Sequence, residues 1–168
     1  KELFEARFCS LDTNIKTFHQ ISSRIQKTID PQEVLSLCAE GLSDVLGYER
    51  VNIMMLDELH STLYFAVCAN IAGFDPASVV LPFDDRAGII YRCMLEKTPY
   101  LVENIDSFAR QYQIQPPYDA IESLRSKSFI VCPIIIKGVA VGVFGVDNKL
   151  SKRVLNDSDL DTVKLFAD

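Results

Sequence analysis

The sequence predicts an α+β domain: a three-layer α/β/α sandwich around a central, mainly antiparallel sheet of about six strands. Short connections separate consecutive β-rich segments, and strands joined in this way pair antiparallel. The segment 128–148 is apolar on both expected faces, which indicates two strands covered from both sides. Helical patterns at both chain ends and between the strands supply that cover.

The segment 128–148 is expected to form a β-hairpin in the middle of the sheet. Its two apolar runs flank Lys137-Gly138, where glycine accepts the positive φ of a two-residue turn. Uninterrupted pairing from this turn would place Ile134 opposite Val141. Pro133 has no N–H group for the ladder, so we expect a bulge or an open position in the first strand at that residue.

The other elements follow from capping residues and apolar periodicity. Asp30 can cap a helix that has Pro31 at its first position, and Gly47 can end that helix. Asn156 or Asp157 can cap the final helix. The remaining predictions are a helix over 3–29, strands over 51–57, 62–69, 79–83 and 99–102, a helix over 88–96, and an irregular segment over 104–126 with a helical turn at 118–124.

The helix over 3–29 carries a seven-residue apolar repeat, which is typical of a coiled-coil seam. Its early turns are expected to contact a second copy of the chain, because one domain cannot cover so long a stripe. The alternative for the later turns is packing on the chain's own sheet, toward which Ile21 would face. The expected dimer-interface residues are Phe4, Phe8, Leu11, Ile15 and Phe18.

Composition limits the possible functions. The 168 residues are enough for one domain with a sizeable core. The net charge is −6 and Lys and Arg do not cluster, which argues against nucleic-acid binding. The sequence has no apolar run long enough to span a bilayer and no signal peptide, so membrane insertion is not expected. The five cysteines are odd in number and lack CxxC spacing, which favours reduced thiols and a cytoplasmic location.

The chain begins without Met and stops inside an expected helix, so we interpret it as a piece of a longer protein. Residues 1–29 are assigned to an N-terminal signalling and dimerisation helix. Residues 30–168 are assigned to a second unit, whose last helix is expected to lead to an output domain beyond this sequence.

From about Pro31 to its end, the chain resembles a GAF domain. The resemblance implies a sheet of about six strands with a small-molecule pocket on one face and terminal helices, which often dimerise, on the other. The pieces that carry it are Val45-Leu46-Gly47 with the strand Arg50–Leu56, Leu81-Pro82-Phe83 leading into Gly88-Ile89, the strand Ser128–Pro133, and Gly142–Val146 running into Asn148-Lys149.

The resemblance implies a non-enzymatic regulatory sensor that binds an unidentified small molecule and needs no cofactor. Its signal would pass through the terminal helices to an output domain, such as a histidine kinase or a cyclic-dinucleotide enzyme. The alternative is a dimerisation module whose pocket is filled by its own side chains, foremost Ile90 and Tyr91. The expected ligand-binding residues are Phe83, Asp84, Asp85, Gly88, Ile89, Ile90, Asn104, Ile105, Tyr118 and Phe129.

The cyclic-nucleotide-binding branch of the family is less favoured. Asn148, Lys149 and Asp159 match part of its motif, and the resemblance implies that these residues brace the fold. Members of that branch keep small residues after the Gly-Ile pair, whereas this chain has the bulky Ile90 and Tyr91.

The enzymatic branch, which reduces free methionine sulfoxide, is also less favoured. Ile90 stands where that branch has one cysteine, and residues 104–128 contain none for the other. We expect Cys38, Cys68 and Cys132 to be buried, whereas Cys93 could be exposed on its helix. The two histidines lie far apart in the sequence and the cysteines do not cluster, so no metal site is expected.

Overall fold

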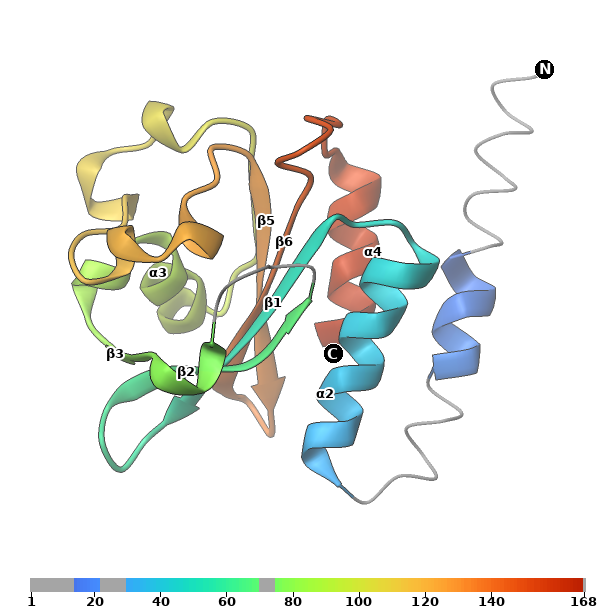
Figure 1. Cartoon of the computed structure of the whole chain (residues 1–168), viewed down its shortest axis with the longest axis horizontal. Coiled ribbons are helices and arrows are strands. Elements are labelled where there is room, and N and C mark those ends of the chain that lie inside the picture. The colour runs from blue at the N-terminus through green and yellow to red at the C-terminus, as the bar shows by residue number, and fades with distance from the viewer. Residues whose placement is uncertain (1–13, 22–29, 70–74, 168) are drawn as a thin grey trace.

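The computed structural model describes residues 14–21, 30–69 and 75–167 (Figure 1). Six strands form one antiparallel sheet in the order β3-β2-β1-β6-β5-β4, which confirms the predicted fold class. The elements are a helical segment 14–21, α2 (Pro31–Glu40), β1 (Arg50–Asp57), β2 (Thr62–Ala69), β3 (Val80–Pro82), α3 (Ile89–Glu96), β4 (Tyr100–Val102), β5 (Phe129–Ile136), β6 (Val139–Asp147) and α4 (Asp157–Ala167).

Helices cover both faces of the sheet. Figure 1 shows α2, α4 and the segment 14–21 on one side, and α3 with the long connection before β5 on the other. No helix in the described ranges is long and apolar enough to cross a membrane. We call the two sides the helical face and the α3 face.

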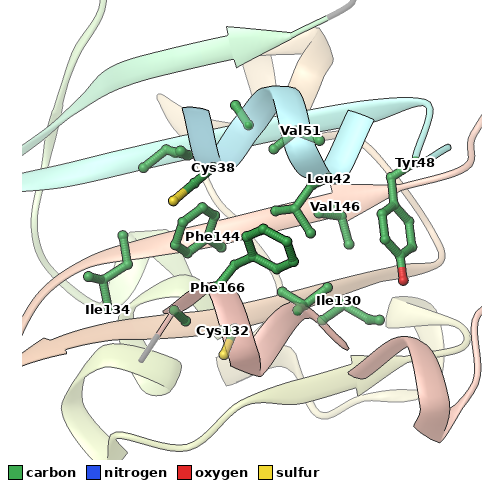
Figure 2. Close-up of a cluster of buried hydrophobic side chains, with 14 of the residues drawn as sticks. Cys38, Leu42, Tyr48, Val51, Ile130, Cys132, Ile134, Phe144, Val146 and Phe166 are labelled. Atoms are coloured by element: carbon green, nitrogen blue, oxygen red, sulfur yellow. The ribbon is translucent and has the colours of Figure 1, made fainter. Parts of the chain in front are cut away.

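The larger hydrophobic core lies on the helical face (Figure 2). Leu42, from the turn Gly41–Val45 that follows α2, lies there with Phe144 of β6 and Phe166 of α4. Ile21 of the segment 14–21 is also buried in this core, and the Phe18 ring meets the Phe166 ring edge-on at 6.2 Å. This part of the first helix therefore packs on its own domain, as the alternative for its later turns predicted. Three expected interface residues, Phe4, Phe8 and Leu11, lie outside the described residues.

The predicted helix caps are confirmed. The Asp30 carboxylate accepts a hydrogen bond from the N–H of Gln32 at 3.0 Å. The Asn156 side chain accepts from the N–H of Asp159 at 3.2 Å, and the Asp159 carboxylate accepts from the N–H of Asn156 at 2.9 Å. This reciprocal capping box fixes where α4 begins.

The central hairpin has the predicted turn, but its register differs. Pairing is as expected next to the turn, and then Ile134 pairs with Gly142 instead of Val141. The bulge therefore lies in β6, and Pro133 pairs with Val143. A Cβ atom on Gly142 would lie 2.5 Å from the Met54 carbonyl oxygen, so the shift places a residue without a side chain at a crowded position.

The connection between β4 and β5 contains no regular element longer than three residues. It is anchored to the domain by the Tyr118 hydroxyl, which donates to the Pro82 carbonyl at 2.7 Å, and by the N–H of Gln115, which donates to the Arg86 carbonyl at 2.9 Å. Its 3₁₀ turns are Ile105–Ser107, Arg110–Tyr112, Tyr118–Ala120 and Glu122–Leu124.

Candidate functional site

Helix α3 lies close to the long connection because of one glycine. Gly88, at the start of α3, has φ +56°. A Cβ atom there would lie 2.6 Å from the carbonyl oxygens of Tyr112 and Gln113. Glycine is therefore needed at this position both for backbone conformation and for close approach. The result is a compartment bordered by α3, the connection and the sheet.

A small cavity of about 60 Å³ remains in this compartment. It is large enough for about two water molecules. Its walls are mostly aliphatic and aromatic, and four polar residues converge at one end. The apolar walls include Met54, Ile89, Leu124, Phe129, Val131 and Val143, and the polar residues are Asn52, Ser123, Ser126 and Asp147.

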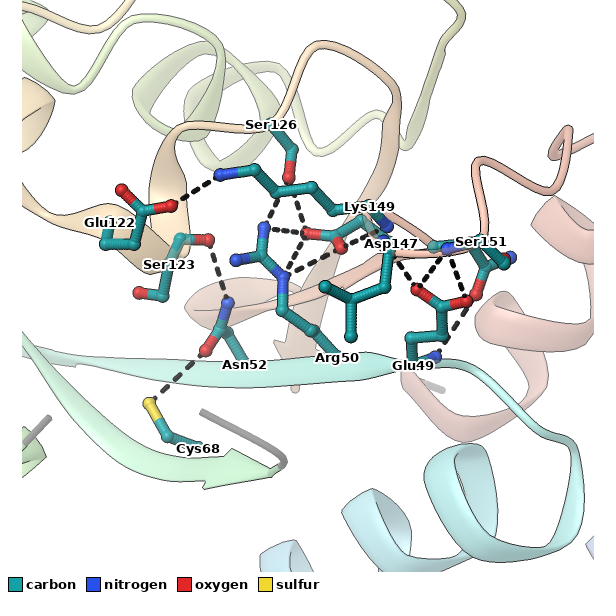
Figure 3. Close-up of polar contacts among 12 residues, drawn as sticks. Glu49, Arg50, Asn52, Cys68, Glu122, Ser123, Ser126, Asp147, Lys149 and Ser151 are labelled. Atoms are coloured by element: carbon teal, nitrogen blue, oxygen red, sulfur yellow. Dashed lines mark hydrogen bonds and ion pairs between the residues drawn. The ribbon is translucent and has the colours of Figure 1, made fainter. Parts of the chain in front are cut away.

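The polar end is built on a buried ion pair (Figure 3). The Arg50 guanidinium contacts the Asp147 carboxylate through Nε at 2.9 Å and Nη2 at 2.7 Å. Both residues are at most 6% exposed. The Ser126 hydroxyl donates to Asp147 at 2.7 Å and accepts from Arg50 at 2.5 Å. The pair compensates its own charge, which a buried ion requires.

Asn52 and Ser123 extend this polar end toward β2. The Asn52 amide donates to the backbone carbonyl of Ser123 at 3.4 Å, and its oxygen accepts from the Cys68 thiol at 3.2 Å. Ser123 is 3% exposed, and its hydroxyl has no hydrogen-bond partner within the described part of the chain. Buried hydroxyls are normally paired, so this oxygen is a buried group whose hydrogen-bonding capacity is unused among the described residues.

A groove of about 250 Å³ adjoins the cavity on the outside. Ile105, Tyr112 and Gln113 contribute to its outer wall. The side chains that separate it from the cavity are shared by both, namely Ile89, Ile114, Leu124, Ser126 and Phe129. Three of these five belong to the long connection, so that connection forms much of the partition.

A larger hollow of about 740 Å³ lies near the β6–α4 connection and carries several basic side chains. Those side chains are largely engaged with acidic residues of the same chain. Lys149 pairs with Glu122 and Lys127 with Asp106, each at 2.6 Å. We therefore do not assign the ligand site to this hollow.

The expected ligand-binding residues divide into three groups. Ile89, Ile90 and Phe129 line the cavity, and Ile105 lines only the groove. Most of the others support the surrounding structure. The Phe83 ring packs on the Tyr91 ring at 5.1 Å, Gly88 starts α3, and Tyr118 is fully buried. Asp84 caps the turn before α3 and Asn104 caps the turn after β4, whereas Asp85 is exposed.

The three expected bracing residues contact different partners. The Asn148 side chain accepts from the N–H of Glu49 at 3.1 Å and so ties β6 to the start of β1. Lys149 pairs with Glu122. Asp159 accepts a hydrogen bond from the Tyr48 hydroxyl at 2.8 Å. The motif thus binds several elements together, but Lys149 pairs with the connection and not with Asp159.

The described cysteines do not resemble activated thiols. Cys93 is fully buried, contrary to the exposure considered from the sequence, because it lies on the face of α3 that packs on the sheet. Cys38 and Cys132 are buried as expected, whereas Cys68 is only half-buried. Desolvation raises the pKa of the Cys38 thiol to about 11 and that of Cys68 to about 12. High pKa values disfavour the thiolate, which is the reactive form.

A family model for the GAF domain matches residues 30–168. The chain therefore belongs to the GAF domain family, as its resemblance predicted.

One solved structure, a fragment of a methyl-accepting chemotaxis protein covering residues 122 to 287, is 56% identical to this chain. The match covers 88% of this chain and 90% of the other, with a TM-score of 0.84. No curated protein matches the chain.

More distant structures share the fold alone. A GAF domain of a phosphoenolpyruvate-protein phosphotransferase from Coxiella burnetii is 15% identical, with a TM-score of 0.74 over 92% of this chain and 88% of the other. Free methionine-R-sulfoxide reductase from Neisseria meningitidis, in complex with its substrate, is 18% identical, with a TM-score of 0.70 over 92% and 83%.

Proposed function

We propose that this chain is the ligand-binding sensor domain of a chemotaxis-type signalling receptor. Membership of the GAF family and the 56% identity to a methyl-accepting chemotaxis protein fragment support this assignment. The domain binds a small molecule on the α3 face and is not an enzyme. We propose a cytoplasmic location, with which the free thiols of Cys38, Cys68 and Cys93 agree.

The observation that carries the proposal is the partition between cavity and groove. Ligand sites usually enclose roughly 300 Å³ or more. The cavity, at about 60 Å³, and the groove, at about 250 Å³, are each too small, but together they reach that size. Displacement of Ile114 and Leu124 would join them into one pocket that is apolar inside and open at its mouth.

The long connection is the part of this partition that can move. Its 3₁₀ turns are short. Its middle is tied to the rest of the domain by the hydrogen bonds of Tyr118 to Pro82 and Gln115 to Arg86. Its end is tied by Ser123 to Asn52, by Glu122 to Lys149, and by Ser126 to Arg50 and Asp147. Ile89 and Phe129, by contrast, belong to α3 and β5. Ligand entry therefore shifts the connection while the sheet and α3 keep their places, and such a shift between two states is what a sensor requires.

The rival proposal is a dimerisation module with a self-filled pocket. The small volume of the cavity favours it, and Ile90 is one of the side chains that fill the space. Tyr91 does not line the cavity, because its ring packs against Phe83. The rival predicts that no small molecule stabilises the domain.

Dimerisation through the terminal helices is a further part of the proposal, with a second copy of the chain as the partner. An apolar hollow of about 550 Å³ lies on the helical face among α2, α4 and the segment 14–21. Phe18 and Leu165 line it, and Ile15, three residues before Phe18 on the same helical segment, is 42% exposed. A helix of the partner that covers these side chains would remove apolar surface from water.

A cavity-filling substitution tests the sensor proposal. Gly145 lines the cavity, and a Cβ atom there would meet nothing closer than 3.9 Å. Gly145→Ala should therefore leave the fold intact, or stabilise it by about 0.5–1 kcal/mol, since glycine is unfavourable in a strand. A small-molecule screen by thermal unfolding should find a compound that raises the Tm of the wild type, because binding to the native state stabilises it.

The substituted protein should bind that compound roughly tenfold more weakly, a loss of ~1.4 kcal/mol. Val139→Ile is the control, because it adds one methyl group to the same strand at an exposed position outside the cavity. If Gly145→Ala binds the compound as tightly as the wild type does, the cavity is not part of the ligand site.

A further inference from the structure

The chemistry of the cavity restricts which groups of a ligand can enter it. We propose that the inserted part of the ligand is an uncharged, compact apolar group with one hydroxyl or carbonyl oxygen, and that Ser123 Oγ is the hydrogen-bond partner of this oxygen. This inference rests on the proposed function and names the ligand class for the same site.

The apolar character follows from the walls. Ile89, Leu124 and Val143 present hydrocarbon to the space, and Phe129 presents an aromatic ring. A compact aliphatic or aromatic group gains contact with these walls without losing hydrogen bonds to water. Ligand sites commonly combine such walls with a few fixed polar groups that set orientation.

The absence of charge follows from Asp147, the single ionisable residue among the described residues that line the cavity. Its Oδ1 accepts from Arg50 Nε at 2.9 Å and from the N–H of Lys149 at 3.1 Å. Its Oδ2 accepts from Arg50 Nη2 and from Ser126 Oγ, each at 2.7 Å. The carboxylate is therefore fully engaged, and an ammonium or carboxylate group of a ligand would be buried without a counter-charge.

The role of Ser123 follows by elimination among the polar side chains at this end. The Asn52 amide is engaged by the Cys68 thiol and by the backbone of Ser123. The Ser126 hydroxyl is engaged by Arg50 and Asp147. Ser123 Oγ is buried without a partner in the described ranges, and it can both donate and accept.

The amide contact also fixes the position of Ser123. Its backbone carbonyl accepts from Asn52 of β1 at 3.4 Å, so the residue contacts the sheet directly. The Ser123 hydroxyl is thus placed to form a hydrogen bond with one polar atom of an otherwise apolar ligand.

Matched sets of compounds test this inference. Neutral alcohols, from propanol through cyclohexanol to phenol, are compared with the hydrocarbon, the carboxylate and the ammonium compound of similar carbon skeleton. Binding is measured from the Tm of the 168-residue chain and, for compounds that respond, by calorimetry. The proteins are the wild type and Ser123→Ala, with Ser128→Ala as a control outside the cavity lining.

We expect at least one alcohol to bind the wild type and Ser128→Ala equally, and to bind Ser123→Ala roughly five- to tenfold more weakly, as loss of a neutral buried hydrogen bond predicts. The matched hydrocarbon should bind the wild type and Ser123→Ala equally, and the charged compounds should not raise the Tm of either protein. Ser123→Ala removes an unpaired hydroxyl, so the protein without ligand should unfold at the same temperature or a higher one.

Two results would overturn the inference alone. One is a carboxylate or an ammonium compound that binds as strongly as the matched alcohol and whose binding is lost in Gly145→Ala, which would place it in the cavity. The other is an alcohol that binds Ser123→Ala as well as it binds the wild type. If no compound in these sets or in a broad metabolite screen raises the Tm, the inference and the sensor function are overturned together.

Discussion

At the scale of single residues, burial decides which groups can react. Desolvation raises the pKa of Cys93 above its ordinary value, with smaller contributions from Cys132 and Glu96. The same effect raises the pKa of Cys38 to about 11 and that of Cys68 to about 12. At pH 8 only about one thiol in a thousand is ionised when its pKa is near 11. These side chains therefore behave as small apolar groups.

Thiol labelling tests this account of the cysteines. With a disulfide reagent at pH 8, Cys38, Cys68 and Cys93 should react at least about a hundredfold more slowly in the native chain than in the unfolded chain. Raising the pH toward the elevated pKa values should speed the reaction of Cys38 before that of Cys68. Mass spectrometry of labelled peptides against time gives the separate rates, and urea-unfolded protein is the control. Rapid labelling of two native cysteines, or turnover of free methionine sulfoxide, would contradict this account and support an enzymatic function.

The polar residues of the site show what the sequence could and could not reveal. Arg50 and Asn52 alternate with apolar residues in a strand that was predicted, so a buried polar group on one face was detectable from their spacing. Ser123 and Ser126 carry no such signal. They lie in an irregular connection, and their distance from Arg50 and Asp147 depends on how that connection folds over the sheet.

At the scale of elements, regular periodicity was the reliable guide. The range 62–69 was predicted for the second strand and is the range of β2, and α3 begins one residue after the predicted start. The irregularity of the hairpin was expected at Pro133 in its first strand, whereas the bulge lies in β6. The bulge places Gly142 where a Cβ atom would meet the Met54 carbonyl, which belongs to a strand far away in the sequence.

The first helix supplies the prediction at this scale. Ile15→Glu should convert the proposed dimer into a folded monomer, because it places a charge on the exposed side of the segment 14–21. We choose Ile15 over Phe18, since the Phe18 ring also contacts Phe166 of its own domain. Gln20→Glu adds the same charge at an exposed position of the same segment and is the control. Light scattering at tens of micromolar gives the mass. A wild-type chain that is already monomeric there would contradict the dimer.

At the scale of the whole molecule, the sheet separates the two proposed functions. The α3 face holds the proposed ligand site, and the helical face holds the terminal helices that are proposed to dimerise. Asp147 ends β6 in the polar cluster, and the chain then turns through 148–156 into α4. The Glu49 carboxylate holds this turn by accepting from the N–H groups of Leu150 and Ser151, at 2.7 and 2.9 Å. We propose that a movement of the long connection reaches α4 through the Glu122–Lys149 pair.

The most direct test of the central claim is to locate a bound compound by NMR. Nuclear Overhauser contacts between the best compound of the thermal screen and the methyl groups of the chain report which side chains it touches. We predict contacts to Ile89, Leu124 and Val143, which line the cavity on the α3 face. Contacts confined to Ile21, Val34 and Leu165, which line the hollow on the helical face, would contradict the account. So would a screen in which no compound gives contacts to any methyl group.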